Sequence, residues 1–143
     1  MLEQPRLYAT PEQVQALVVK TYKETGRMLS FPAALRRLDR QGALSSQSLD
    51  YPPFLENMSP AEFDAFVLKV PFDATQIMSH DHSASRTASL IKEEGMFPFE
   101  KDVFCFKHMP YMDETPHFHD YFEITYIYSG SCRLLFNGES FAL

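Results

Sequence analysis

The chain has 143 residues, of which 45% are hydrophobic and 14% aromatic, and this share of apolar side chains is enough to build a core, which excludes a disordered chain. The formal net charge is −6, divided as −2 over residues 1–95 and −4 over residues 96–143, and this balance excludes a surface that binds DNA by neutralising its phosphates. No apolar run approaches the ~20 residues that cross a bilayer, so no membrane partner is expected.

The first predicted helix begins at Thr10-Pro11-Glu12-Gln13. Thr10 is a capping residue, the proline stands where a missing N–H costs nothing, and Gln13 is spaced to close a capping box. Gly26 is placed to end this helix. Its apolar face follows the i, i+3, i+4 spacing of a helix and consists of Val14, Leu17, Val18 and Tyr22.

A second helix is predicted from Ser30 to Gln41, with Leu35 and Leu38 facing inward and Gly42 as the stop. Two helices joined by a glycine turn, the second carrying arginines, also fit a DNA-reading helix-turn-helix. A helical hairpin with solvated arginines is the favoured interpretation, because the connection "GRMLSFP" is long for that motif and no clear third helix follows closely. The arginines are Arg36, Arg37 and Arg40.

A third helix is predicted to begin at Ser59-Pro60-Ala61-Glu62, which repeats the capping pattern of the first. A fourth is predicted around Ser85 to Glu94, after a polar stretch. That stretch includes His80-Asp81-His82, where two imidazoles can share a cation, but its polar neighbours favour a solvated loop. The inward face of the third helix is predicted to consist of Phe63, Phe66, Val67 and Val70.

From Asp102 the pattern changes to runs of aromatic and β-branched residues, which predict strands at residues 102–109, 121–128, 132–136 and 139–143. Asn137-Gly138 between the last two runs predicts a two-residue hairpin turn. Helices followed by strands predict an α+β fold or two separate units. We expect a helical amino-terminal region over residues 1–95 and a strand region over residues 96–143.

The two cysteines, Cys105 and Cys132, both lie in strand-like apolar runs. Buried, reduced thiols are expected there, because a chain of this size needs no disulfide. The amino terminus lacks the basic start and hydrophobic stretch of a signal peptide. Together these features predict a cytoplasmic protein.

The motif that bears on function is "HFHDYFEITYIYSG", residues 117–130. In a strand, alternate side chains share a face, so the polar side chains of its first half are predicted to point the same way. On a straight strand, at ~3.3 Å per residue, Glu123 lies about 13 Å from His119, so both reach one ion only if the chain bends. The residues predicted to share this face are His117, His119, Tyr121 and Glu123.

A His-x-His pair, a glutamate four residues later and Gly130 seven further on resemble the first motif of the cupin superfamily. More closely, residues 102–143 are similar to the start of the cupin sensor region of AraC-type transcriptional regulators. The sequence departs from the general cupin pattern at Tyr111, where a glycine is expected. The second cupin motif, with its further histidine, is missing.

The resemblance implies the first antiparallel strands of an incomplete cupin jelly-roll barrel, which binds a small-molecule effector and mediates homodimerisation. It also implies DNA binding only through a carboxy-terminal helix-turn-helix region absent from this chain. No enzymatic activity, catalytic residue, metal or cofactor is expected. The expected ligand-binding residues are His117, His119, Tyr121 and Glu123, with Tyr126 and Tyr128 as aromatic walls.

Two alternatives stay open. Two histidines and a carboxylate are the ligand set of an iron site in oxygen chemistry, so the chain could belong to a metal-dependent cupin enzyme, an oxygenase or isomerase. The motif could also build only a dimerisation module with no ligand. Because the last apolar run, residues 139–143, has no evident partner, we expect either a longer protein or a second copy to cover it.

Overall fold

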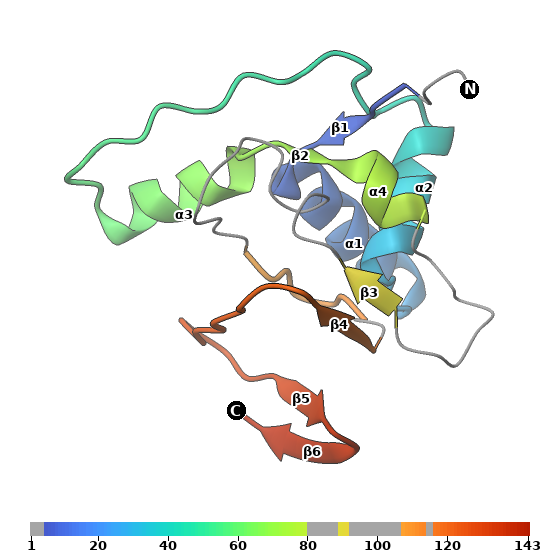
Figure 1. The fold of residues 1–143 in the computed structure, drawn as a ribbon, viewed down its shortest axis with the longest axis vertical. Coiled ribbons are helices and arrows are strands. Elements are labelled where there is room, and N and C mark those ends of the chain that lie inside the picture. The colour runs from blue at the N-terminus through green and yellow to red at the C-terminus, as the bar shows by residue number, and fades with distance from the viewer. Residues whose placement is uncertain (1–4, 80–88, 92–106, 114–115) are drawn as a thin grey trace.

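In a computed structural model of the chain, residues 5–79, 89–91, 107–113 and 116–143 are described. They form a mixed α+β fold, as the sequence predicts, in which the helices lie together and the last two strands form a hairpin apart from them (Figure 1). The helices are α1 (Pro11–Thr25), α2 (Phe31–Arg40), α3 (Pro60–Lys69) and α4 (Ala74–Ser79). The strands are β1 (Tyr8–Ala9), β2 (Phe72–Asp73), β3 (Ser89–Ile91), β4 (His117–His119), β5 (Arg133–Phe136) and β6 (Glu139–Ala142).

Helix α1 begins and ends where its local sequence predicts. The backbone N–H of Thr10 donates a hydrogen bond to Gln13 Oε1 at 2.9 Å, which satisfies one of the unpaired donors at the start of the helix. Gly26 adopts φ 68°, and its N–H donates to the Tyr22 carbonyl at 2.7 Å. Of the predicted apolar face, Val14, Leu17 and Val18 are buried and Tyr22 is half-buried.

Helix α2 also confirms its prediction, because Ser30 Oγ accepts a hydrogen bond from the Ala33 N–H at 3.3 Å and both Leu35 and Leu38 are buried. Two of its three arginines form hydrogen bonds with neighbouring helices. Arg36 donates to the Met78 carbonyl at 3.4 Å, and Arg37 donates to Thr21 Oγ1 at 3.3 Å.

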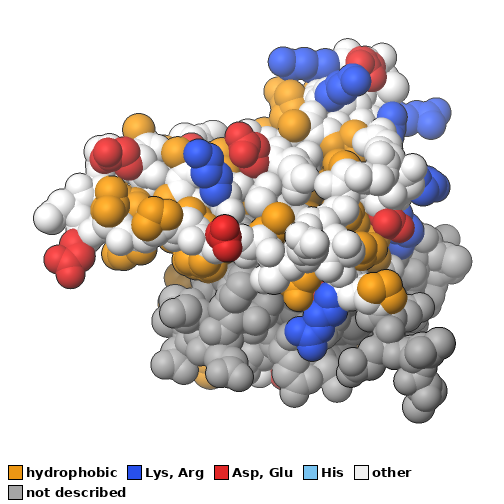
Figure 2. Space-filling view, turned by 90° about the horizontal axis from the view of Figure 1, so that it is seen from above, with side chains coloured by type: hydrophobic (Ala, Val, Ile, Leu, Met, Phe, Trp, Pro, Cys, Tyr) orange, Lys and Arg blue, Asp and Glu red, His pale blue; other side chains and the backbone are white. Residues whose placement is uncertain are grey.

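Helix α3 has the predicted capping box, with Glu62 Oε2 accepting the Ser59 N–H at 2.8 Å. Val67 and Val70 are buried as predicted, whereas Phe63 is 41% exposed and Phe66 is half-buried, so the predicted inward face is wrong for these two rings. The rings instead form an aromatic cluster on the outer surface of α3 and the loop before it, where hydrophobic side chains gather (Figure 2). Phe66 contacts Tyr51, Phe54 and Phe63 at centroid distances of 5.9, 5.6 and 6.3 Å.

The predicted fourth helix, Ser85 to Glu94, is wrong where the structure describes it, because residues 89–91 form strand β3; its remaining residues lie outside the described part of the chain. The structure has instead a short helix, α4, directly after β2. Asp73 Oδ1 accepts the Thr75 N–H at 2.9 Å at its start. A residue near the amino terminus holds the start of α4 in place, since the Leu7 N–H donates to Thr75 Oγ1 at 2.7 Å.

One hydrophobic core joins the helices to segments distant in sequence. Strand β1 pairs with β2 in an antiparallel manner, and the rings of Phe31 and Phe72 lie 5.4 Å apart. Met109, from the strand region of the sequence, is 6% exposed and belongs to the same core. The buried core residues are Ala9, Val14, Leu17, Val18, Phe31, Ala34, Leu35, Leu38, Phe72, Ala74, Ile77 and Met109.

The strand region confirms its last two strands and their turn. Strands β5 and β6 pair in an antiparallel manner across Asn137 (φ 49°) and Gly138 (φ 83°), the positive φ pair of a type I′ turn. All residues of both strands are exposed. Cys132, expected to be buried, is exposed and free, because it leads into a hairpin whose two strands are exposed along their whole length; Cys105 lies outside the described residues.

The other two predicted strands are wrong where the structure describes their residues. Residues 122–128 form no strand, and neither do residues 107–109 of the first predicted run, whose earlier part lies outside the described residues. The described strands form three two-stranded sheets. The expectation of antiparallel strands is wrong for one of them, because β4 pairs with β3 in a parallel manner. Within the described part of the chain, no helix is long and apolar enough to cross a membrane.

Candidate functional site

Strand β4 places two histidines on one face, because residues two apart in a strand point the same way. The strand pairs with β3, with His117 opposite Ser89 and His119 opposite Ile91. The two imidazole rings lie 5.3 Å apart, centroid to centroid. Both side chains are half-buried, so they are held by their surroundings and still open to a ligand.

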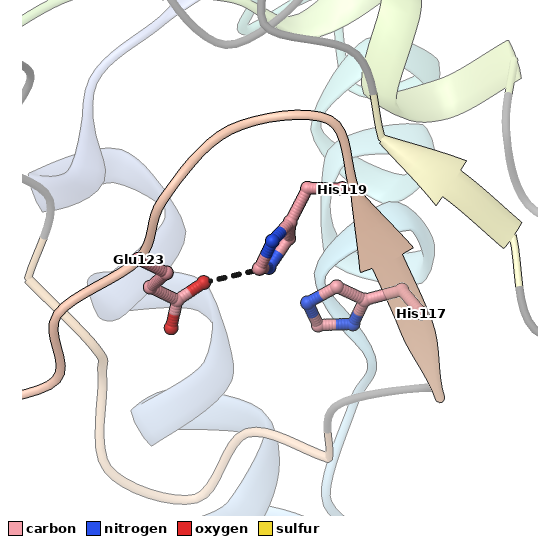
Figure 3. A group of neighbouring side chains, drawn as sticks. All are labelled: His117, His119 and Glu123. Carbon is pink, nitrogen blue, oxygen red and sulfur yellow. Dashed lines mark ion pairs between the residues drawn. The ribbon is translucent and has the colours of Figure 1, made fainter.

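The strand ends at His119, and the chain bends through Asp120 and Tyr121. This bend turns Glu123 back toward the histidines, so that Glu123 Oε2 lies 2.9 Å from His119 Nε2 (Figure 3). On the continuous strand predicted from the sequence, the two residues are about 13 Å apart. The predicted strand is therefore wrong at this point, and the bend that a shared site requires is present.

Tyr121 completes the group at the inside of the bend. Its ring stacks on the His119 imidazole, with centroids 4.5 Å apart and an interplanar angle of 21°. Burial, and then the negative charges of Glu123 and Asp120, raise the pKa of Tyr121 to about 12. The phenol therefore keeps its proton at neutral pH and can donate a hydrogen bond.

The second oxygen of Glu123 has neighbours as well. Thr125 Oγ1 donates a hydrogen bond to Glu123 Oε1 at 3.0 Å, and His108 Nε2 lies 3.9 Å from the same oxygen. His108 was not among the residues predicted for the site. Nothing in the sequence indicates its role, because it stands outside the His-x-His spacing and reaches the site only through the fold.

The structure brings the four predicted ligand-binding residues together but does not surround them with the predicted aromatic walls. Tyr126 is 82% exposed and Tyr128 is 72% exposed, because residues 122–128 leave the bend without pairing to another strand. A cavity of about 270 Å³ between α1 and α2 contains none of the predicted site residues. The candidate site is thus an open surface site at the end of β4.

One ligand atom from each of His117, His119 and Glu123 lies within 4.8 Å of the others. Two atoms that bind one ion at about 2.0–2.2 Å are at most about 4.4 Å apart, so small side-chain rotations suffice to close such a site. Two imidazole nitrogens and a carboxylate oxygen suit iron, manganese, nickel or zinc. The residues present therefore fit a transition-metal ion. The pair His80 and His82 lies outside the described residues.

Comparisons with protein-family models, with curated proteins and with solved structures find no match to this chain. Its function is therefore proposed from the residues and geometry of the site. Three features of that site matter most: the imidazole pair, the carboxylate returned by the bend, and the protonated phenol stacked beside them.

Proposed function

We propose that this chain is the amino-terminal sensor portion of an AraC-type transcriptional regulator of the cytoplasm, and that it is not an enzyme. In this proposal the strand region, residues 96–143, contributes the first strands of a cupin jelly-roll barrel that binds a small-molecule effector. DNA binding belongs to a carboxy-terminal helix-turn-helix region outside this chain, in keeping with the net charge of −6.

The observation that carries the proposal is the bend at Asp120 and Tyr121, which brings His119, Tyr121 and Glu123 into contact. A small ligand needs a few convergent polar groups beside an aromatic surface. Here the phenol of Tyr121 donates and the carboxylate of Glu123 accepts, while each imidazole can do either. The stacked rings of His119 and Tyr121 offer a flat face to a planar ligand.

Thermal unfolding in the presence of a panel of small molecules tests this proposal. A ligand that binds only the folded chain stabilises it by about 2.7 kcal/mol at a concentration of 100 times its Kd. We expect an effector to raise the unfolding midpoint of the parent chain, and Glu123→Ala to abolish that rise. Glu139→Ala is the matched control, because Glu139 is also an exposed glutamate of the strand region.

A compound that stabilises the parent and Glu123→Ala chains equally would bind elsewhere and contradict the proposed site. In the complete regulator, the corresponding readout is DNA affinity. The regulator proposal would be contradicted if the DNA affinity did not change with any small molecule and also did not change when both His119 and Glu123 were replaced by alanine.

Homodimerisation is part of the same proposal and rests on the β5–β6 hairpin. Its large apolar side chains are exposed, with Leu135 at 62% and Phe136 at 61%. An exposed apolar hairpin is typical of an interaction surface. Sedimentation over a range of concentrations is expected to show a dimer that Leu135→Ser with Phe136→Ser weakens; an unchanged equilibrium places the dimer contact elsewhere.

A second candidate function, a metal-dependent cupin enzyme of the oxygenase or isomerase class, is favoured by one observation. The ligand atoms of His117, His119 and Glu123 converge within 4.8 Å, and a bound ion would supply Lewis-acid or redox chemistry there. Elemental analysis of protein purified without chelator tests it. A stoichiometric metal that is lost on His117→Ala and His119→Ala, but kept on His108→Ala, favours the enzyme over the sensor.

A further inference from the structure

Residues Lys107–Asp113, here called the connecting segment, are anchored in the helical part of the chain. Met109 is 6% exposed and lies in the core formed by α1, α2 and α4. Lys107 Nζ forms an ion pair with Asp64 Oδ1 of α3. The Asp113 N–H donates to the Leu29 carbonyl at 2.9 Å. The segment is therefore held at three separate places, none of which belongs to the candidate site.

Tyr111 is a strained residue at the middle of this segment. Its φ is 61°, a backbone conformation that is a genuine outlier for a bulky side chain and that persists only where the surroundings impose it. Its ring stacks on Tyr22 of α1, with centroids 4.1 Å apart and an interplanar angle of 7°. Because Tyr111 is 44% exposed, burial alone does not hold its ring, and the stack on α1 is a contact that helps to hold it.

The same segment reaches the candidate site through the residue next to Met109. His108 Nε2 lies 3.9 Å from Glu123 Oε1, while the other oxygen, Glu123 Oε2, lies 2.9 Å from His119 Nε2. Two consecutive residues thus face opposite ways, Met109 into the helical core and His108 toward the site carboxylate. A movement of the connecting segment would therefore displace both residues, and would change the packing around Met109 and the position of His108 beside Glu123 together.

We propose that the connecting segment couples the candidate site to helix α1, with Tyr111 as a positioning residue that acts on Glu123 through His108. The inference rests on the proposed function only in taking the His119–Glu123 site as the place where a ligand binds. A ligand that moves Glu123 changes the position of His108 and, through Tyr111, the packing on Tyr22. Coupling of this kind is reciprocal, so a change at Tyr22 must also be felt at the site.

The imidazole signals of the ¹⁵N-labelled full chain in nuclear magnetic resonance test this coupling without any ligand. Tyr22 lies on α1 and is absent from the site, and its stack on Tyr111 links it to the connecting segment. We expect Tyr22→Ala to shift the His108 and His119 signals, and Tyr22→Phe, which keeps the stacked ring, to restore them. Lys23→Ala, an exposed neighbour on α1, is expected to leave them unchanged.

Imidazole signals that stay in place in Tyr22→Ala while the ring signals of Tyr111 move would overturn the proposal. If Tyr22→Ala does not fold, Tyr22→Leu keeps most of the half-buried volume while removing the ring, and the same comparison applies. The test is independent of the proposed function. If Tyr22→Ala shifts the imidazole signals but the chain binds no compound, the sensor proposal is refuted and the coupling is not. If the chain binds a compound but Tyr22→Ala leaves the imidazole signals in place, the coupling is refuted and the sensor proposal is not.

Discussion

Single residues at the bend decide what the site can do. Tyr121 is the clearest case, because its raised pKa has two kinds of cause: burial, which is the larger, and the charges of Glu123 and Asp120. The folded chain therefore holds the phenol proton more tightly than the unfolded chain does. By linkage, the stability this provides is present below the ordinary tyrosine pKa of about 10 and is lost as pH rises toward about 12.

Glu123→Gln is expected to lower the pKa of Tyr121 without returning it to the ordinary value, because the charge of Glu123 is removed while burial remains. Titration of the Tyr121 ring signals measures this directly. Glu139→Gln serves as the control, since it removes the same charge from the β5–β6 hairpin. A pKa that does not change in Glu123→Gln would mean that the carboxylate does not face the phenol in solution.

Tyr111 shows how far sequence reasoning reaches at this scale. Its φ of 61° is one that glycine adopts without strain but that a bulky side chain rarely adopts. No residue beside Tyr111 in the sequence indicates that a tyrosine adopts this conformation here. The stack with Tyr22 that accompanies it is a contact between residues far apart in the chain.

Helices and strands were predictable from the sequence where residues next to their ends determine where they begin or turn. Helices α1, α2 and α3 begin at serine or threonine caps with a proline at the first or second helical position, and Asn137-Gly138 defines its own turn, so neighbouring residues suffice. Strands β1, β2 and β3 escaped prediction because each exists only through a partner distant in sequence. The bend after His119 was predicted only as a condition for a shared site, since Asp120-Tyr121 carries no glycine or proline to indicate it.

The turn of the β5–β6 hairpin gives a test at the scale of one element. Gly138→Ala forces a side chain into a φ of 83°, which costs at least about 1 kcal/mol. We expect hydrogen exchange of the Leu143 N–H, which donates to the Cys132 carbonyl at 2.9 Å, to accelerate about fivefold for that cost. Ser140→Ala, in β6 but outside the turn, is expected to change it little; equal protection in the parent and Gly138→Ala chains would argue against this turn.

At the scale of the whole molecule, we expect the buried core of the helical part to provide most of the free energy of unfolding. Leu35 is fully buried in the core, whereas Leu135 is 62% exposed on the hairpin, which makes the two leucines a matched pair. Leu35→Ala is expected to lower the free energy of unfolding by about 2–5 kcal/mol because it leaves a cavity, and Leu135→Ala to change it by less than about 0.5 kcal/mol. Urea unfolding of both variants measures the difference.

An equal loss in the two leucine variants would mean that the hairpin is packed in solution, most simply against a second copy of the chain. Dilution separates that case, since contacts between copies weaken at low concentration and contacts within one chain do not. The same comparison therefore tells an isolated hairpin from a buried one.

The contact between Leu7, just before β1, and Thr75, at the start of α4, also bears on the order in which the chain folds. The Leu7 N–H reaches Thr75 Oγ1 across 68 positions of sequence, whereas α1 and α2 are joined by a short connection. Closing the longer loop costs more chain entropy, and contacts between residues far apart in sequence slow folding. We therefore expect the α1–α2 hairpin to form early in folding, and the pairing of Tyr8 and Ala9 with β2 to form later.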